Sequence, residues 1–153
     1  MNNVSLHLYQ GESLGIIGEP GASKTLIGRI LAGEVKPDKG RIKRNGSLYF
    51  GDIEDKHLHE ETVSAFVQNA VELFTYSVNE HKVEQILRYA DLFELKDKVV
   101  YQLTDQQYAQ LIVSLARTSK ADIIIFNHVL HYLDEAFLLS LIHISEPTRQ
   151  EAI

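Results

Sequence analysis

Cysteine is absent from the 153 residues of this chain, which excludes disulfide bonds and metal sites built on thiolates. A block of basic residues is also missing, since 15 Lys and Arg stand against 21 Asp and Glu, for a formal charge of −6. A surface for nucleic acid is therefore not expected, because such surfaces depend on clustered positive charge. The lack of cysteine fits a cytoplasmic protein.

Long apolar runs are missing as well. No stretch approaches the roughly 18 apolar residues that a membrane-spanning helix requires. The polar N-terminus does not resemble a secretory signal. Apolar residues still make up 44% of the chain, which is ordinary for a globular protein. We therefore expect one domain, whose association with a membrane would depend on a partner.

The pattern of apolar residues predicts a mixed α/β chain. Strands are expected at residues 4–9, 13–17, 41–43, 47–50 and 122–127. Helices are expected at residues 24–32, 61–74, 80–93 and 105–118. The block from residue 52 to residue 100 carries no strand signal.

The strongest functional signal is a loop between a strand-like run and a helix-like run. It consists of Gly18, Glu19, Pro20, Gly21, Ala22, Ser23, Lys24 and Thr25. It lies one residue away from the phosphate-binding pattern G-x-x-x-x-G-K-[ST]. Backbone N–H groups of such a loop, together with the positive end of the next helix, can surround phosphate oxygens. The loop is therefore predicted to bind a nucleotide.

The last two residues of this motif have chemical roles. Lys24 is placed to reach the β and γ phosphates, and Thr25 offers a hydroxyl to Mg²⁺. Ser23 stands where the pattern has glycine, and if that position needs a positive φ the serine costs about 1–2 kcal/mol. The alternative is a plain strand-to-helix turn whose lysine faces solvent. The flanking runs favour the nucleotide loop.

Residues on both sides of the loop resemble the beginning of an ABC-transporter ATP-binding subunit. The matching residues are Val4-Ser5, Gly11-Glu12, Leu31-Ala32-Gly33 and Asn45-Gly46. The resemblance runs from residue 3 to about residue 138, is weak between residues 50 and 78, and is nearest to the group that exports polysaccharide or teichoic acid. It implies a P-loop NTPase fold of the ABC nucleotide-binding type. It also implies ATP and Mg²⁺ as cofactors, a second nucleotide-binding subunit, and a transmembrane permease at the cytoplasmic side of the membrane.

Two later motifs of that family are recognisable but altered. The signature falls on residues 103–107, where Thr104 and Gln107 can still form a capping box while Asp105 and Gln106 replace glycines. A carboxylate at Asp105 would repel a triphosphate, so a capped helix without a phosphate role is equally favoured. The glutamine loop of the family cannot be placed, and Asp134 lies near its D-loop position.

The buried strand that ends in Asp-Glu in the family ends here in Asn127 and His128. By this resemblance Asn127 occupies the Mg²⁺ position and His128 the position of the general base, so Lys24 and His128 are the catalytic candidates. Hydrolysis is expected to be slow or absent, because a carboxylate is missing from both positions. One alternative is a non-hydrolysing, structural subunit of such a transporter, which holds nucleotide weakly or not at all. A less favoured alternative is another P-loop class, such as a small-molecule kinase.

The predicted organisation is a partial ABC nucleotide-binding domain at residues 1–138, with a helical arm at about residues 52–100 that docks on the membrane partner. Residues 139–153 resemble a translated sequencing adapter, since LSLIHISEPTR from Leu139 to Arg149 matches one frame of a common transposase adapter without a break. The histidine loop of the family is then missing.

Metal sites at residues 57–61 or at His128 and His131 are less favoured than exposed loops.

Overall fold

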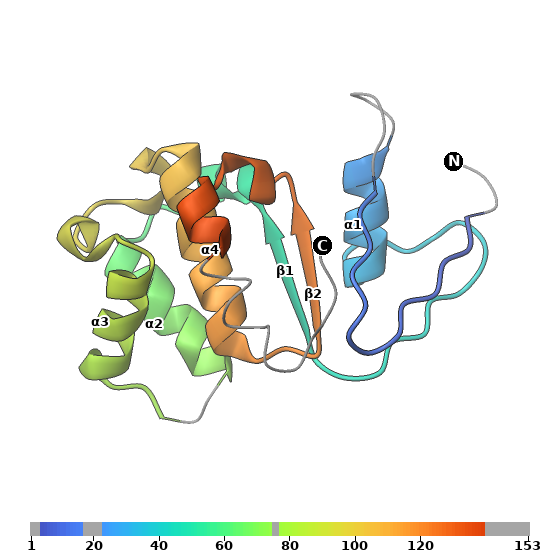
Figure 1. Cartoon of the computed structure of the whole chain (residues 1–153), viewed down its shortest axis with the longest axis horizontal. Helices are drawn as coiled ribbons and strands as arrows, with labels where there is room; N and C mark the ends of the chain where they lie inside the picture. Colours follow the sequence, from blue (N-terminus) through green and yellow to red (C-terminus); the bar gives the residue numbers. More distant parts are fainter. Residues whose placement is uncertain (1–3, 17–22, 75–76, 140–153) are drawn as a thin grey trace.

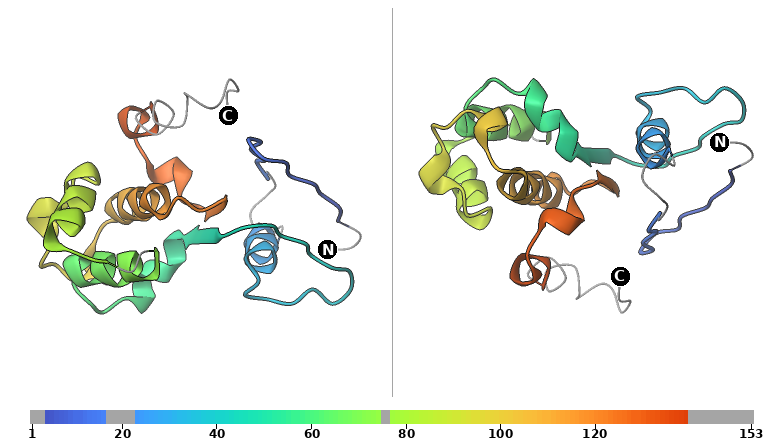
Figure 2. Two further views of the ribbon diagram at one scale, coloured as in Figure 1. Left: turned by 90° about the horizontal axis from the view of Figure 1, so that it is seen from below. Right: turned by 90° about the horizontal axis from the view of Figure 1, so that it is seen from above.

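The computed structural model describes residues 4–16, 23–74 and 77–139. Its helices and strands are, in chain order, α1 (Lys24–Ala32), β1 (Leu48–Asp52), α2 (Val63–Phe74), α3 (Glu80–Tyr89), α4 (Asp105–Ser119) and β2 (Ile123–Asn127). In Figures 1 and 2, α1 lies on one side of the two strands and helices α2 to α4 lie on the other. The mixed α/β class predicted from the sequence is therefore present.

The two strands pair in parallel, from Leu48 opposite Ile123 to Asp52 opposite Asn127. Parallel strands need a long crossover, and here α2, α3 and α4 supply it. At the start of the pair, the Ser47 backbone N–H donates to the Asp122 carboxylate at 2.9 Å. At the other end, the parallel register places Asp52 and Asn127 side by side at one edge of the sheet.

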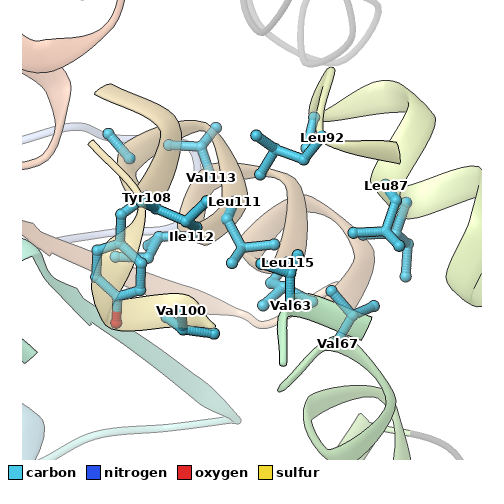
Figure 3. Close-up of a cluster of buried hydrophobic side chains, with 14 of the residues drawn as sticks. Val63, Val67, Leu87, Leu92, Val100, Tyr108, Leu111, Ile112, Val113 and Leu115 are labelled. Atoms are coloured by element: carbon cyan, nitrogen blue, oxygen red, sulfur yellow. The ribbon is translucent and has the colours of Figure 1, made fainter. Parts of the chain in front are cut away.

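The hydrophobic core lies among the helices that follow the first strand. The face of α4 that was predicted to be apolar is buried, with Tyr108, Leu111, Ile112 and Leu115 each 2% exposed or less. Figure 3 shows these side chains meeting residues of α2 and α3, among them Val63, Val67 and Leu87. Gly51 of β1 permits this packing, because a Cβ there would overlap the side chain of Ile112.

The start of α4 confirms the predicted capping box. The Thr104 hydroxyl accepts from the Gln107 backbone N–H at 3.1 Å, and the Gln107 side chain accepts from the Thr104 backbone N–H at 3.0 Å. Two N–H groups at the helix start are thereby satisfied without phosphate. This pair fixes where the helix begins and which face it presents to the core.

Three of the strand predictions are wrong over the described residues. Residues 4–16 and 33–47 contain no strand, and their apolar side chains are largely exposed, as at Val4 (55%) and Leu8 (48%). A strand needs a neighbour that pairs its backbone groups, and the described sheet has only β1 and β2. The predicted helix at 80–93 ends early, at Tyr89, because Asp91 adopts a left-handed φ of 61°.

Candidate functional site

The first helix begins at an unusual residue. Ser23 precedes α1 with φ 62° and ψ 20°, and its side chain makes no capping hydrogen bond. The positive φ confirms the reason for glycine in the motif, because a Cβ is strained in this conformation. The backbone strain at Ser23 is therefore not offset by a capping hydrogen bond from its side chain.

Thr25 contacts the end of β2. Its hydroxyl accepts a hydrogen bond from the Asn127 side-chain amide at 3.2 Å. The two residues predicted to face Mg²⁺ are thus brought together by the fold, although they are far apart in the sequence. Lys24 opens the same helix and is half-buried. The rest of the predicted loop, Gly18, Glu19, Pro20, Gly21 and Ala22, lies outside the described residues.

Asp52 is a buried carboxylate that sequence reasoning missed. It ends β1 at 1% exposure, and its Oδ2 accepts from the Asn127 amide at 3.2 Å. The same oxygen pairs with Arg29 of α1 at 2.8 Å, and Oδ1 accepts from the Glu54 backbone N–H at 3.1 Å. A buried charge is tolerated only when it is paired and hydrogen-bonded in this way.

Arg29 holds several carboxylates at once. Besides Asp52, it pairs with Asp55 at 3.2 Å and with Glu34 at 2.5 Å. The hydrogen bond with Asp55 is the main cause that raises the pKa of Arg29 above its usual value, and Glu34 adds to it. Arg29 therefore stays a cation and links α1 to the edge of the sheet.

Hard oxygen atoms are the ligands that Mg²⁺ prefers, and the Thr25 hydroxyl and the Asp52 carboxylate fit that requirement. Asn127 presents its N–H donors to both of them, rather than the acceptor oxygen that its predicted metal role needs. Among the described residues, no group of three or more His, Asp or Glu could hold a metal. The arrangement fits an ion that takes its other ligands from phosphates and water.

At the signature position, the charge of Asp105 is paired, which the sequence did not predict. The Asp105 carboxylate pairs with Lys56 at 2.6 Å, and the same ammonium donates to the Leu103 carbonyl at 3.0 Å. Lys56 is 8% exposed, so this pairing is partly removed from water. The repulsion predicted between Asp105 and a triphosphate is therefore reduced, because a cation already neutralises the carboxylate.

His128 follows β2 with a left-handed φ of 58° and is exposed. It lines a cavity of about 270 Å³ with Ile53, Glu54, His57, Asp105 and Tyr132. Its ring makes no hydrogen bond to the residues that the structure describes, whereas a general base is normally oriented by a third group. Its catalytic role stays a prediction.

The remaining candidates have structural partners. His59 contacts Glu61 at 3.1 Å and packs edge-on against Phe66. His131 stacks on Tyr132 with ring centroids 4.1 Å apart. Asp134 accepts from the Phe137 backbone N–H at 2.7 Å, which is a cap at a helix start. A metal at residues 57–61 is not supported within the described part of the chain.

A family model described as ABC transporter matches residues 1–136. The zinc import ATP-binding protein ZnuC of Rickettsia conorii is 28% identical over 134 residues, which are 88% of this chain and 58% of that protein. The Fe(3+) ions import ATP-binding protein FbpC 2 of Haemophilus influenzae is 25% identical over 171 residues, covering 100% of this chain and 46% of that protein. The chain thus spans about half the length of such relatives.

Among solved structures, one described as a metal-chelate type ABC transporter in an inward-facing conformation superposes with a TM-score of 0.69. It is 21% identical and covers 92% of this chain and 60% of its own, so the likeness shows the fold. The predicted P-loop fold is confirmed. The predicted export of a polymer is not supported, because the relatives above, like a taurine protein of Ruegeria pomeroyi, are named for import.

Proposed function

This chain belongs to the ABC transporter family, and we propose that it is the ATP-binding subunit of an importer, with the loop from Gly18 to Thr25 around the phosphates. One observation carries the proposal. The Thr25 hydroxyl at the start of α1 is hydrogen-bonded to Asn127 at the carboxyl end of β2. Ligands of parallel sheets bind at the carboxyl ends of the strands, which is where these residues meet.

The residues divide the work of holding ATP. Lys24 opens α1, where its ammonium can reach the terminal phosphates, and the positive end of the helix adds to the attraction. Mg²⁺, when bound, neutralises charge that develops on the phosphates. Thr25 is the hydroxyl that would hold the ion, and its hydrogen bond with Asn127 at the end of β2 supports this role.

Slow or absent hydrolysis is the second part of the proposal. Asn127 carries no charge and turns its N–H groups toward Thr25 and Asp52. His128 is exposed and has no orienting partner among the described residues. Binding of ATP without rapid turnover therefore fits this site better than fast catalysis. A non-hydrolysing subunit is the candidate that these two residues favour.

A binding titration tests the nucleotide site. Mg-ATP and a non-hydrolysable analogue should bind with similar affinity, and phosphate release should be slow. Lys24→Ala should weaken the binding of both nucleotides by at least about tenfold, which corresponds to about 1.4 kcal/mol. Lys39→Ala, an exposed lysine in the turn after α1, serves as the matched control and should change neither. Equal loss in both variants, or no binding by the unmodified chain, would overturn the proposal.

A transmembrane permease and a second nucleotide-binding subunit are the proposed partners, at the cytoplasmic face of the membrane. Within the described residues, the structure contains no helix with the length and apolar character to cross a bilayer.

The import direction and a small ion or solute as cargo rest on the names of the relatives. Loss of the gene should reduce uptake of such a solute. Unchanged uptake together with altered envelope polymers would instead support export.

A further inference from the structure

Asp52 is a buried carboxylate that lies beside the residues predicted to face the nucleotide. It is 1% exposed and lies at the sheet edge where parallel strands place ligands. Burial of a carboxylate costs stability unless partners compensate for lost water. The position of this buried acid, at the ligand-binding edge and beside the residues predicted to face the phosphates, is compatible with a role toward a ligand.

The position of Asn127 links this acid to the nucleotide helix. One amide nitrogen of Asn127 donates both to the Thr25 hydroxyl and to Asp52 Oδ2, each at 3.2 Å. Thr25 and Asp52 thus turn two oxygen atoms toward one position, which the Asn127 amide nitrogen occupies in this structure. Resting on the proposed function, we propose that Asp52, rather than Asn127, supplies the charged oxygen to the divalent cation that accompanies the nucleotide.

Arg29 explains how the site stays stable without the cation. Its guanidinium pairs with Asp52 Oδ2 at 2.8 Å, so the buried carboxylate keeps a counter-charge. Arg29 also pairs with Asp55 and Glu34, both more exposed than Asp52. These two carboxylates remain as its partners when a metal ion takes the charge of Asp52. Arg29 is therefore a competitor that lowers the affinity for the cation.

The test measures metal and nucleotide separately on the 153-residue chain. Mn²⁺ is titrated in the presence of a non-hydrolysable ATP analogue and free Mn²⁺ is counted by EPR, while nucleotide affinity is measured in EDTA. Asp52→Asn should lower Mn²⁺ affinity by about tenfold or more, since even outer-shell partners of a metal matter on that scale. Nucleotide affinity in EDTA should stay within about twofold or rise, because a carboxylate near the phosphates is removed.

Loss of Mn²⁺ affinity with nucleotide affinity retained separates a metal-facing residue from a structural one, whose loss would weaken both affinities. Asp55→Asn is the matched control, because Asp55 also pairs with Arg29 but makes no hydrogen bond to Asn127 among the described residues. It should change neither affinity by more than about twofold. Unchanged Mn²⁺ affinity in Asp52→Asn, with nucleotide binding intact, overturns this inference alone. No nucleotide binding by the unmodified chain overturns the proposed function as well.

A second variant covers the case in which Asp52→Asn does not fold, as judged by circular dichroism. Arg29→Gln removes the guanidinium that pairs with Asp52 Oδ2 at 2.8 Å. The buried carboxylate then lacks its counter-charge, which a divalent cation can supply. Mn²⁺ affinity should then rise about tenfold if Asp52 faces the metal. An affinity unchanged or reduced by Arg29→Gln would contradict the inference.

Discussion

The region of residues 53–133, here called the helical region, and residues 4–16 with 23–47, here called the loop region, are held together differently. The helical region contains the apolar cluster built on α2, α3 and α4. Within the described part of the loop region, Gly28 is the one buried residue. The helical region therefore carries the apolar burial that stabilises the fold.

The loop region depends instead on a few polar contacts with the sheet edge. Thr25 reaches Asn127, and Arg29 reaches Asp52. Such contacts contribute about 0.5–3 kcal/mol each, less than a buried apolar side chain in a well-packed core. The loop region is thus the part that a bound nucleotide can stabilise most. Binding adds stability that grows with the logarithm of ligand concentration.

Removal of a core side chain should expose this difference most strongly. Leu111→Ala, at 0% exposure in α4, should lower the free energy of unfolding by about 2–5 kcal/mol, through lost burial and the cavity left behind. Leu26→Ala, at 41% exposure in α1, should cost less than about 1 kcal/mol. Urea denaturation of the two variants measures both values. Equal losses would show that the loop region shares the core.

Alkaline pH should weaken the fold through two tyrosines, the buried Tyr108 and the half-buried Tyr49. Burial raises the pKa of Tyr108 on α4 and of Tyr49 on β1 far above the usual range. Because the folded pKa is raised, this stability is fully present below the unfolded pKa of about 10 and is lost as pH rises above it. Each tyrosine costs up to about 1.4 kcal/mol per pH unit in that range.

Denaturation midpoints between pH 8 and pH 11 test this expectation. Tyr108→Phe should flatten the alkaline loss, because it removes one of the two ionising groups. Tyr101→Phe, a change at a side chain that is 44% exposed, is the matched control and should leave the profile as it is. A profile that Tyr108→Phe does not change would mean that another group governs alkaline unfolding.

The helices and their caps were predictable, because the information lies within a few residues of sequence. Residues 24–32 form α1 as predicted, and Thr104 with Gln107 begins α4 as the capping box required. The strands predicted at 4–9 and 41–43 are absent from the structure, because alternating apolar residues become a strand only when a neighbour pairs with them. A single segment contains no record of that neighbour.

The residues of the candidate site also fall into those that local sequence predicts and those that it does not. Lys24, Thr25 and Asn127 were found from motifs with fixed spacing, and the structure brings Thr25 and Asn127 together. Asp52 and Lys56 were missed, because an isolated charge in a sequence reads as a solvated residue. The burial of Asp52 follows from the parallel register, which places the ends of β1 and β2 together. Lys56 is covered where its ammonium contacts Asp105 and the Leu103 carbonyl. Two strands that both end in polar residues were the available signal.

Loss of the cap on α4 should have a smaller effect than loss of its core residues. Thr104→Ala removes the hydroxyl that accepts from the Gln107 backbone N–H, and should cost about 1 kcal/mol. Thr118→Ala removes a hydroxyl that bonds within the same helix instead, to the Ser114 carbonyl, and is the comparison for loss of a helix hydroxyl away from the cap. Urea denaturation should separate them. A cost at Thr104 no larger than at Thr118 would deny the capping box its role.

The finest comparison concerns two helix ends with positive φ, one in each region. Ser23 precedes α1 at φ 62°, and Lys120 follows α4 at φ 52°. Glycine at either position should add up to about 1 kcal/mol of stability, because relief of a 1–2 kcal/mol strain exceeds the added backbone entropy of about 0.5–1 kcal/mol. Ser23→Gly should also tighten nucleotide binding by a few-fold, since the loop then needs no strained residue beside the phosphates.

Lys120→Gly should leave nucleotide binding unchanged, because Lys120 begins the connection to β2 at the opposite end of the strand from Asn127. The pair therefore separates general relief of strain from an effect on the phosphate loop. Thermal denaturation reports the first quantity, and titration with the ATP analogue reports the second. If both variants gain stability but neither changes nucleotide affinity, the backbone at Ser23 is strained without any consequence for the phosphates, and the departure from the glycine pattern is neutral for binding.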